Sequence, residues 1–99
     1  MKYTVKPSVY AKTDRKNIVQ YLEQYSIAAP VKFKQALKKY IDIISDTPNI
    51  FSKYSADSSY RHVTVFGAYI MFYTVNEAEK TVLIYRILHG AQDIERILQ

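Results

Sequence analysis

The sequence predicts an α+β domain in which an antiparallel pair of helices packs on an antiparallel sheet. Two segments before residue 47 repeat apolar residues every three or four positions, which is typical of amphipathic helices. Three runs after residue 59 are rich in Val, Ile, Tyr, Phe and Thr, which favour strands. Because helices and strands are grouped rather than alternating along the chain, the helical pair is expected to cover one face of a sheet of about four strands.

The N-terminal strand is expected over residues 2–7. Tyr3 and Val5 alternate with polar neighbours, as in a strand with one buried face, and Pro7 suits the end of a strand. Ser8 is a suitable N-cap for the helix that follows. This strand is expected to join the sheet formed by the three later runs.

The helical pair is expected over residues 9–25 and 29–46. A break of only a few residues joins the two segments, so they are predicted to form an antiparallel hairpin. Pro30 suits the first turn of the second helix, and Thr47-Pro48-Asn49 ends it. The apolar face of the first helix carries Ala11, Ile18, Leu22 and Tyr25, and that of the second carries Phe33, Ala36, Leu37, Tyr40 and Ile44.

The three later strands are predicted to form an antiparallel meander. Because side chains alternate along a strand, Arg86 and Leu88 are expected on one face of the last strand, and Tyr85 and Ile87 on the other. The strands are expected over residues 60–66, 69–75 and 81–88, with turns at 67–68 and 76–79 and a loop over 49–58 before them.

Length and composition limit the classes of function. The 99 residues are expected to form one domain over 1–99, without cysteine and therefore without a thiolate metal site. Two histidines and scattered carboxylates give no metal-ligand spacing, so neither metal nor cofactor is expected. No signal peptide is visible, and no apolar run approaches the roughly 20 residues that span a bilayer. A cytoplasmic protein with no membrane partner is therefore expected.

Positive charge is concentrated in the first half of the chain. Residues 1–50 hold nine Lys and Arg against four Asp and Glu, whereas residues 51–99 hold five of each. The first half thus accounts for the net charge of +5. This favours an acidic protein or a nucleic acid as partner, although a solvated lysine face that maintains solubility explains the same charge.

Arg86 interrupts an otherwise apolar strand. Its structural interpretation is a salt bridge to an acid such as Asp93 or Glu95. Its functional interpretation is a clamp for a phosphate or carboxylate, which a guanidinium binds through two parallel hydrogen bonds. Arg61, at the start of an earlier strand, offers the same chemistry, whereas His62 next to it is expected to be a packed or edge residue of the sheet.

His89 lies where the last strand ends, immediately before Gly90. The structural interpretation is a hydrogen bond that closes the turn into a short C-terminal helix. The functional interpretation is a general acid or base in RNA cleavage, because an imidazole titrates near pH 6.5. The apolar residues of the expected helix are Ile94, Ile97 and Leu98.

Four motifs occur in order along nearly the whole chain. They are Ala28-Ala29-Pro30-x-x-Phe33 at the start of the second helix, Thr47-Pro48 at its end, Arg61-x5-Gly67-x-Tyr69-x3-Tyr73 through the hairpin, and Arg86-Ile87-Leu88-His89-Gly90-Ala91-Gln92-Asp93 at the close. With the order of elements, these motifs resemble the ParE/RelE superfamily of toxins from bacterial type II toxin–antitoxin systems, and the ParE branch most closely. The resemblance implies the RelE/ParE-like fold.

Two functions follow from the two branches of this superfamily. The ParE branch implies a growth inhibitor that binds and poisons DNA gyrase without a reaction of its own, with Arg61, Arg86 and His89 as target-binding residues. The RelE branch implies a metal-independent endoribonuclease that cuts mRNA on the ribosome, with the same three residues as its catalytic groups. The chain departs from the RelE pattern at four positions: Val63, Ile70 and Gln92 stand where basic residues are expected, and Leu98 near where a tyrosine is expected.

The resemblance also implies a cognate antitoxin, an acidic protein that forms a hetero-oligomer with the toxin. The charge of +5 suits such a partner, and a disordered acidic segment can fold as it wraps the toxin. Tyrosine combines apolar area with a polar hydroxyl and is common at interfaces. The candidate antitoxin-binding residues are Tyr10, Tyr21, Tyr54 and Tyr60.

Overall fold

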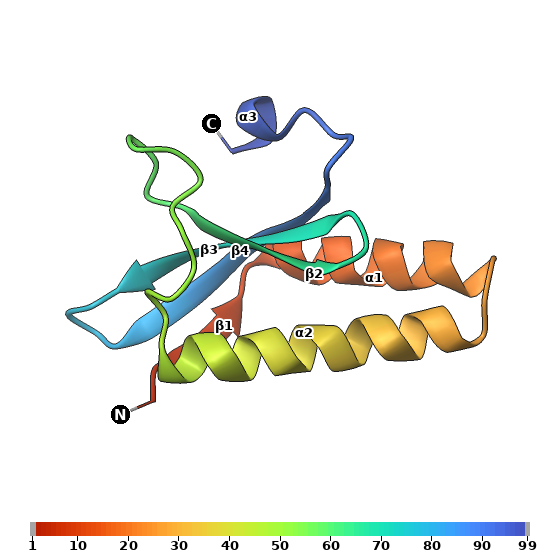
Figure 1. Cartoon of the computed structure of the whole chain (residues 1–99), viewed down its shortest axis with the longest axis horizontal. Helices are drawn as coiled ribbons and strands as arrows, with labels where there is room; N and C mark the ends of the chain where they lie inside the picture. Colours follow the sequence, from red (N-terminus) through yellow and green to blue (C-terminus); the bar gives the residue numbers. More distant parts are fainter. Residues whose placement is uncertain (1, 99) are drawn as a thin grey trace.

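The computed structural model describes residues 2–98 and has the predicted order of elements (Figure 1). The helical hairpin lies on one side of the sheet, and the loop before β2 lies with the short C-terminal helix on the other. The α+β class is therefore confirmed. The elements are β1 Thr4–Pro7, α1 Val9–Glu23, α2 Ala28–Asp46, β2 Arg61–Phe66, β3 Tyr69–Asn76, β4 Thr81–His89 and α3 Ile94–Ile97.

The sheet has four strands in the order β1-β4-β3-β2. Strands β2, β3 and β4 form the predicted antiparallel meander. The first strand differs from the expectation of an antiparallel sheet, because β1 pairs with β4 in parallel, with Val5 opposite Val82. Alternation within one segment shows which side chains share a face, but it does not encode the direction of the neighbouring strand. The sheet is therefore mixed.

A β-bulge in β4 changes which side chains share a face. Phe72 pairs with Arg86 and Tyr73 pairs with Ile84, so Tyr85 is an extra residue on β4. Ile84 and Ile87 consequently both belong to the core on the helix side, although they are three positions apart. The prediction that Tyr85 shares a face with Ile87 was wrong, because simple alternation does not hold across a bulge.

The main core lies between the helical hairpin and the sheet. Phe33 and Ile44 on α2 are fully buried against strand residues that include Met71, Tyr73 and Val82. Ser8 caps α1 as predicted, since its Oγ accepts a hydrogen bond from the Ala11 N–H at 3.0 Å. Proline at position 30 is buried within the first turn of α2, again as predicted.

Tyr25 was expected on the apolar face of the first helix, but its side chain is 70% exposed. The helix ends at Glu23, and Figure 1 shows that the connection between α1 and α2 lies beyond the end of the sheet. No strand therefore lies beneath Tyr25, and a helical repeat alone does not show where the opposing sheet stops.

A smaller aromatic cluster covers the opposite face of the sheet. The ring of Tyr54, from the loop before β2, packs edge-on against Phe72 with centroids 5.4 Å apart, and it also contacts His62. Phe72 and Leu88 are buried, and the shared face explains why both lie outside the main core. The prediction that His62 is a packed or edge residue of the sheet is confirmed.

Candidate binding surfaces

Arg86 forms an ion pair across the molecule with Asp14 of α1. Its Nε and Nη2 donate to the two carboxylate oxygens at 2.7 and 2.9 Å. The two side chains are only 21% and 12% exposed, and the hydrogen bonds that Arg86 donates to Asp14 raise the pKa of Arg86 further. A salt bridge was predicted, but its expected partners, Asp93 and Glu95, were wrong: Asp93 instead caps α3 by accepting from the Arg96 N–H.

Asp14 also completes the edge of β4 where β1 ends. The Ile87 N–H donates to its Oδ2 at 2.9 Å, so one carboxylate accepts three hydrogen bonds. At the N-cap of α1, Ser8 donates from its Oγ to the Tyr85 carbonyl and from its N–H to the Ile84 carbonyl. Side chains at the start of α1 therefore replace the strand partner that β1 no longer provides.

Asp14 was not identified from the sequence, although a signal was present. It lies three residues after Ala11 and four before Ile18, on the apolar face of the first helix. An acid on an apolar helix face and an arginine in an apolar strand are both out of pattern, and together they satisfy each other. Combining these two observations would have predicted the ion pair between Asp14 and Arg86.

Arg61 fastens the loop between α2 and β2. Its Nη1 donates to the Phe51 carbonyl at 2.7 Å, while the buried Tyr73 hydroxyl donates to the Pro48 carbonyl, also at 2.7 Å. Burial raises the pKa of Tyr73 to about 12, although the nearby Arg61 charge acts in the opposite direction. The guanidinium therefore contributes to loop structure and is only partly exposed.

His89 closes the turn after β4, as its structural interpretation predicted. Its Nδ1 accepts a hydrogen bond from the Ala91 N–H at 3.0 Å, and its backbone N–H donates to the Gln92 Oε1 at 2.7 Å. The imidazole packs edge-on against Tyr69. Because Nδ1 accepts a hydrogen bond, the remaining proton of the neutral ring lies on Nε2.

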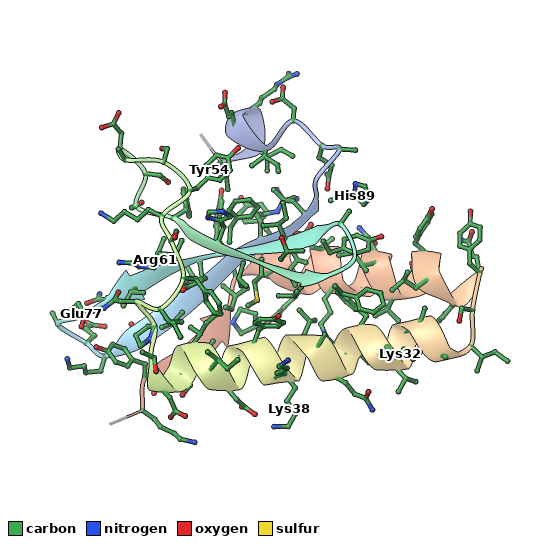
Figure 2. The ribbon with its side chains drawn as sticks, in the orientation of Figure 1. Lys32, Lys38, Tyr54, Arg61, Glu77 and His89 are labelled. Atoms are coloured by element: carbon green, nitrogen blue, oxygen red, sulfur yellow. The ribbon has the colours of Figure 1, made fainter. Side chains whose placement is uncertain are left out.

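The structure does not bring Arg61, Arg86 and His89 together as one site. Arg61 pairs with Tyr73 near the middle of β3, whereas His89 pairs with Tyr69 at its first residue. Figure 2 shows the labelled side chains of Arg61 and His89 at opposite ends of the sheet. Arg86 pairs with Phe72, between those two positions of β3, but its side chain extends to Asp14 on α1. Cleavage of RNA would require these side chains to converge in one cleft, because one group must bind the phosphate, another must deprotonate the nucleophile and a third must protonate the leaving group.

A groove of about 580 Å³ runs between α1 and α2 above the sheet. Its apolar floor includes Val5 and Ile84, and its basic rim is formed by Lys12, Arg15, Lys34 and Lys38. Asp42 is the acidic residue of the rim, and it is paired with Lys38 at 3.1 Å. The groove therefore offers apolar contact beneath an excess of positive charge.

The candidate antitoxin-binding tyrosines differ in accessibility. Tyr10 and Tyr21, both on α1, are 58% and 52% exposed. Tyr54 and Tyr60 are half-buried in the aromatic cluster on the opposite face of the sheet, where Tyr60 stacks on Tyr85. Burial raises the pKa of Tyr60. The two tyrosines on α1 therefore present the larger free surfaces.

The structure also bears on what metalloproteins and membrane-spanning proteins require. Among residues 2–98, no three His, Cys, Asp or Glu side chains are grouped so that they could hold a metal ion. Across the same described residues, every helix is too short or too polar to cross a membrane.

Three solved structures with this arrangement come from toxin–antitoxin systems. One chain of the chromosomal ParDE system from P. aeruginosa matches with a TM-score of 0.71 and 18% identity, covering 89% of this chain and 96% of the other. One from the RelBE2 complex of Mycobacterium tuberculosis matches with a TM-score of 0.63 and 17% identity, covering 90% and 99%. One from the RelE–RelB complex of Pyrococcus horikoshii OT3 matches with a TM-score of 0.58 and 19% identity, covering 93% and 99%. These similarities define the fold as that of the RelE/ParE-like toxins.

The sequence places the chain more narrowly within that fold. Residues 5–94 match the family model described as the ParE toxin of the type II toxin–antitoxin system parDE. No curated protein matches the chain. The chain belongs to the ParE toxin family, as the motifs indicated.

Proposed function

We propose that this ParE-family chain arrests bacterial growth by binding and poisoning DNA gyrase, and that a cognate acidic antitoxin neutralises it in a hetero-oligomeric complex. The resemblance to the ParE branch supports gyrase as the target. The observation that carries the choice of binding over catalysis is the separation of the three candidate residues. Arg61 and Arg86 are engaged within the fold, and the β3 partners of Arg61 and His89 are four residues apart along the strand.

Arg61, Arg86 and His89 remain the proposed target-binding residues, with different contributions. His89 is exposed and can contact a partner through Nε2. Arg86 and Arg61 act by positioning, because one holds α1 against β4 and the other holds the loop before β2. Replacing either arginine is therefore expected to change the shape of the surface as well as its charge.

The groove between α1 and α2 is the proposed docking place of the antitoxin. An amphipathic acidic segment fits it, because its apolar side chains would meet the floor and its carboxylates the basic rim. Among the candidate tyrosines, Tyr10 is positioned on α1 near the groove residue Ala11, with its ring against the Arg86 guanidinium. Tyr54 and Tyr60 would extend the contact to the opposite face, as a wrapping chain requires. The three similar structures come from a ParDE system and from RelBE2 and RelE–RelB complexes, which supports an antitoxin partner.

Purified protein added to gyrase in a supercoiling assay tests the proposal. Loss of supercoiling, with linear DNA trapped as a cleavage complex, supports gyrase poisoning, and induced cells should form filaments. A reconstituted translation reaction run in parallel should keep its mRNA intact. A small acidic protein encoded beside this chain should bind it and restore supercoiling.

The RelE-like alternative makes the opposite prediction in the same experiment. mRNA would be cut only when ribosomes are present, gyrase would remain active, and Arg61→Ala or His89→Ala would restore growth. Unchanged supercoiling together with cut mRNA would therefore refute the proposal and favour a metal-independent endoribonuclease.

A further inference from the structure

The end of the helical hairpin exposes an unusual amount of apolar surface. We call Tyr21, Tyr25, Ile27 and Val31 the hairpin tip; their side chains are 52%, 70%, 96% and 54% exposed. All four lie within eleven consecutive residues spanning the connection between α1 and α2. Figure 1 shows this connection projecting past the end of the sheet, where no other element covers it. Exposed apolar groups gathered in this way are typical of protein-binding surfaces.

The hairpin tip is also well ordered by local hydrogen bonds. Ser26 Oγ accepts from the Ala28 and Ala29 N–H groups, which the start of α2 would otherwise leave unpaired. The N–H groups of Tyr25 and Ser26 donate to the Leu22 carbonyl, and the Tyr21 and Tyr25 rings pack with centroids 5.0 Å apart. A surface fixed before binding loses little conformational entropy when it binds.

The net charge of the whole chain resides on the hairpin behind this tip. Residues 15–39 hold six basic residues and one acid, Glu23, while the rest of the sequence is balanced. All six are exposed, and Figure 2 shows Lys32 and Lys38 pointing away from the sheet. We call this set the basic shaft: Arg15, Lys16, Lys32, Lys34, Lys38 and Lys39.

We propose that the hairpin tip and basic shaft extend the target-binding surface beyond His89, which lines one hollow together with Tyr21, and that they bind the protein target at an apolar socket with an acidic rim. The inference rests on the proposed function, in that the chain acts by binding. A protein suits the tip better than a nucleic acid, because the most exposed residue is the aliphatic Ile27 and five of the six shaft cations are lysines rather than arginine, which binds phosphate in bidentate fashion. A second copy is disfavoured because two basic shafts repel each other.

This assignment also explains how an antitoxin in the groove would neutralise the toxin. Arg15, Lys34 and Lys38 belong both to the groove rim and to the basic shaft. Carboxylates placed on the rim would mask half of the shaft charge that attracts the target. Tyr21, first considered a candidate antitoxin contact, is therefore assigned to the target-binding surface instead.

The first experiment compares the tip variant Tyr25→Ser/Ile27→Ser with the control Val9→Ser/Ile50→Ser, which also removes exposed apolar groups. Truncating one buried interface anchor typically weakens binding by about 30-fold or more. The tip variant loses two such side chains, so it should require at least roughly 100-fold more protein to inhibit gyrase and should not arrest growth. The control should match the parent. Equal potency of tip variant and parent in cells would overturn the inference.

A second comparison tests the basic shaft and the choice of partner. Lys32→Glu should weaken inhibition and its salt dependence, whereas Lys53→Glu, an exposed lysine outside the shaft, should not. Both tip and shaft variants should keep the parent melting temperature and bind the antitoxin. Lost antitoxin binding by the tip variant, tip-dependent binding to a 30-base-pair DNA duplex, or dimers dissolved by the tip variant would each overturn the inference.

These outcomes separate the inference from the proposed function. If the parent arrests growth, the tip variant does not, and gyrase is unaffected by either, the tip surface stands and the choice of gyrase fails. If gyrase is inhibited equally by both, gyrase stands and the tip surface fails. A parent chain that neither arrests growth nor inhibits gyrase would refute both.

Discussion

Replacing Asp14 with alanine is expected to be the most damaging single change at the surface of α1. The carboxylate accepts two hydrogen bonds from Arg86 and one from the Ile87 N–H. Alanine would leave a mostly buried guanidinium without its counter-ion and a strand N–H without an acceptor. Asn at the same position keeps an acceptor for Ile87 but removes the charge.

The expected loss lies between those of exposed and buried pairs. Exposed ion pairs contribute about 0–1 kcal/mol, whereas breaking a buried pair costs about 3–5 kcal/mol. With side chains 21% and 12% exposed, Asp14→Ala should lower the free energy of unfolding by about 2–4 kcal/mol. For a domain of this size, that corresponds to a fall in melting temperature of roughly 10–25 °C. Asp14→Asn should lose about 1–2 kcal/mol.

Urea denaturation followed by circular dichroism measures these losses directly. Asp42→Ala is the matched control, because it removes the Lys38–Asp42 pair, whose side chains are 77% and 63% exposed. That change should cost less than about 0.5 kcal/mol. If Asp14→Ala and Asp42→Ala unfold at the same urea concentration, the edge of β4 does not depend on Asp14 and the reasoning is refuted.

Three further predictions concern the loop, the turn and the hairpin tip. Tyr73→Phe leaves the Pro48 carbonyl without its donor, so calorimetry should record a loss of about 1–3 kcal/mol. The raised pKa of about 12 shows that the fold favours the neutral form of Tyr73. The neutral phenol therefore stabilises the fold fully below pH 10, and about 3 kcal/mol of this stabilisation is lost between pH 10 and 12. Tyr73→Phe should lack this loss of stability at alkaline pH. Hydrogen bonds from Tyr3 and Asn49 lower the pKa of Glu77, so its stabilisation is present above pH 4.5 and lost as pH falls through the lowered value. Urea midpoints of Glu77→Gln should therefore change less between pH 6 and 3 than those of the parent; equal slopes would contradict this. Ile27→Ser should alter the unfolding free energy by less than about 0.5 kcal/mol, because the side chain is 96% exposed, and a larger loss would show that the tip supports the fold.

The elements were predictable from the sequence because their signals are local. Apolar repeats identified both helices, and Ser8, Pro30 and Thr47 defined three of their ends. The strand boundaries differ from the prediction by at most two residues. The parallel direction of β1 was not predictable, since it depends on which distant strand lies beside it.

The candidate site was predicted less completely, because its contacts are long-range. The turn formed by His89 involves residues two and three positions away, and it was anticipated. The partner of Arg86 lies 72 positions away, and only the complete fold brings it near. The hairpin tip was missed for a related reason: its residues continue a helical apolar pattern, and only the length of the sheet decides that they remain uncovered.

The β-bulge at Tyr85 determines which face of the sheet each later side chain of β4 occupies. If β4 kept Tyr85 but alternated regularly through it, with no bulge, Arg86 would enter the core in place of Ile87, and each later side chain up to the end of β4 would turn to the opposite face. Deleting Tyr85 itself would leave Ile84 and Ile87 on one face, whereas a one-residue insertion or deletion elsewhere in β4 would turn the following side chains to the other face. Such changes should be tolerated much better in the loop before β2 than at those positions of β4.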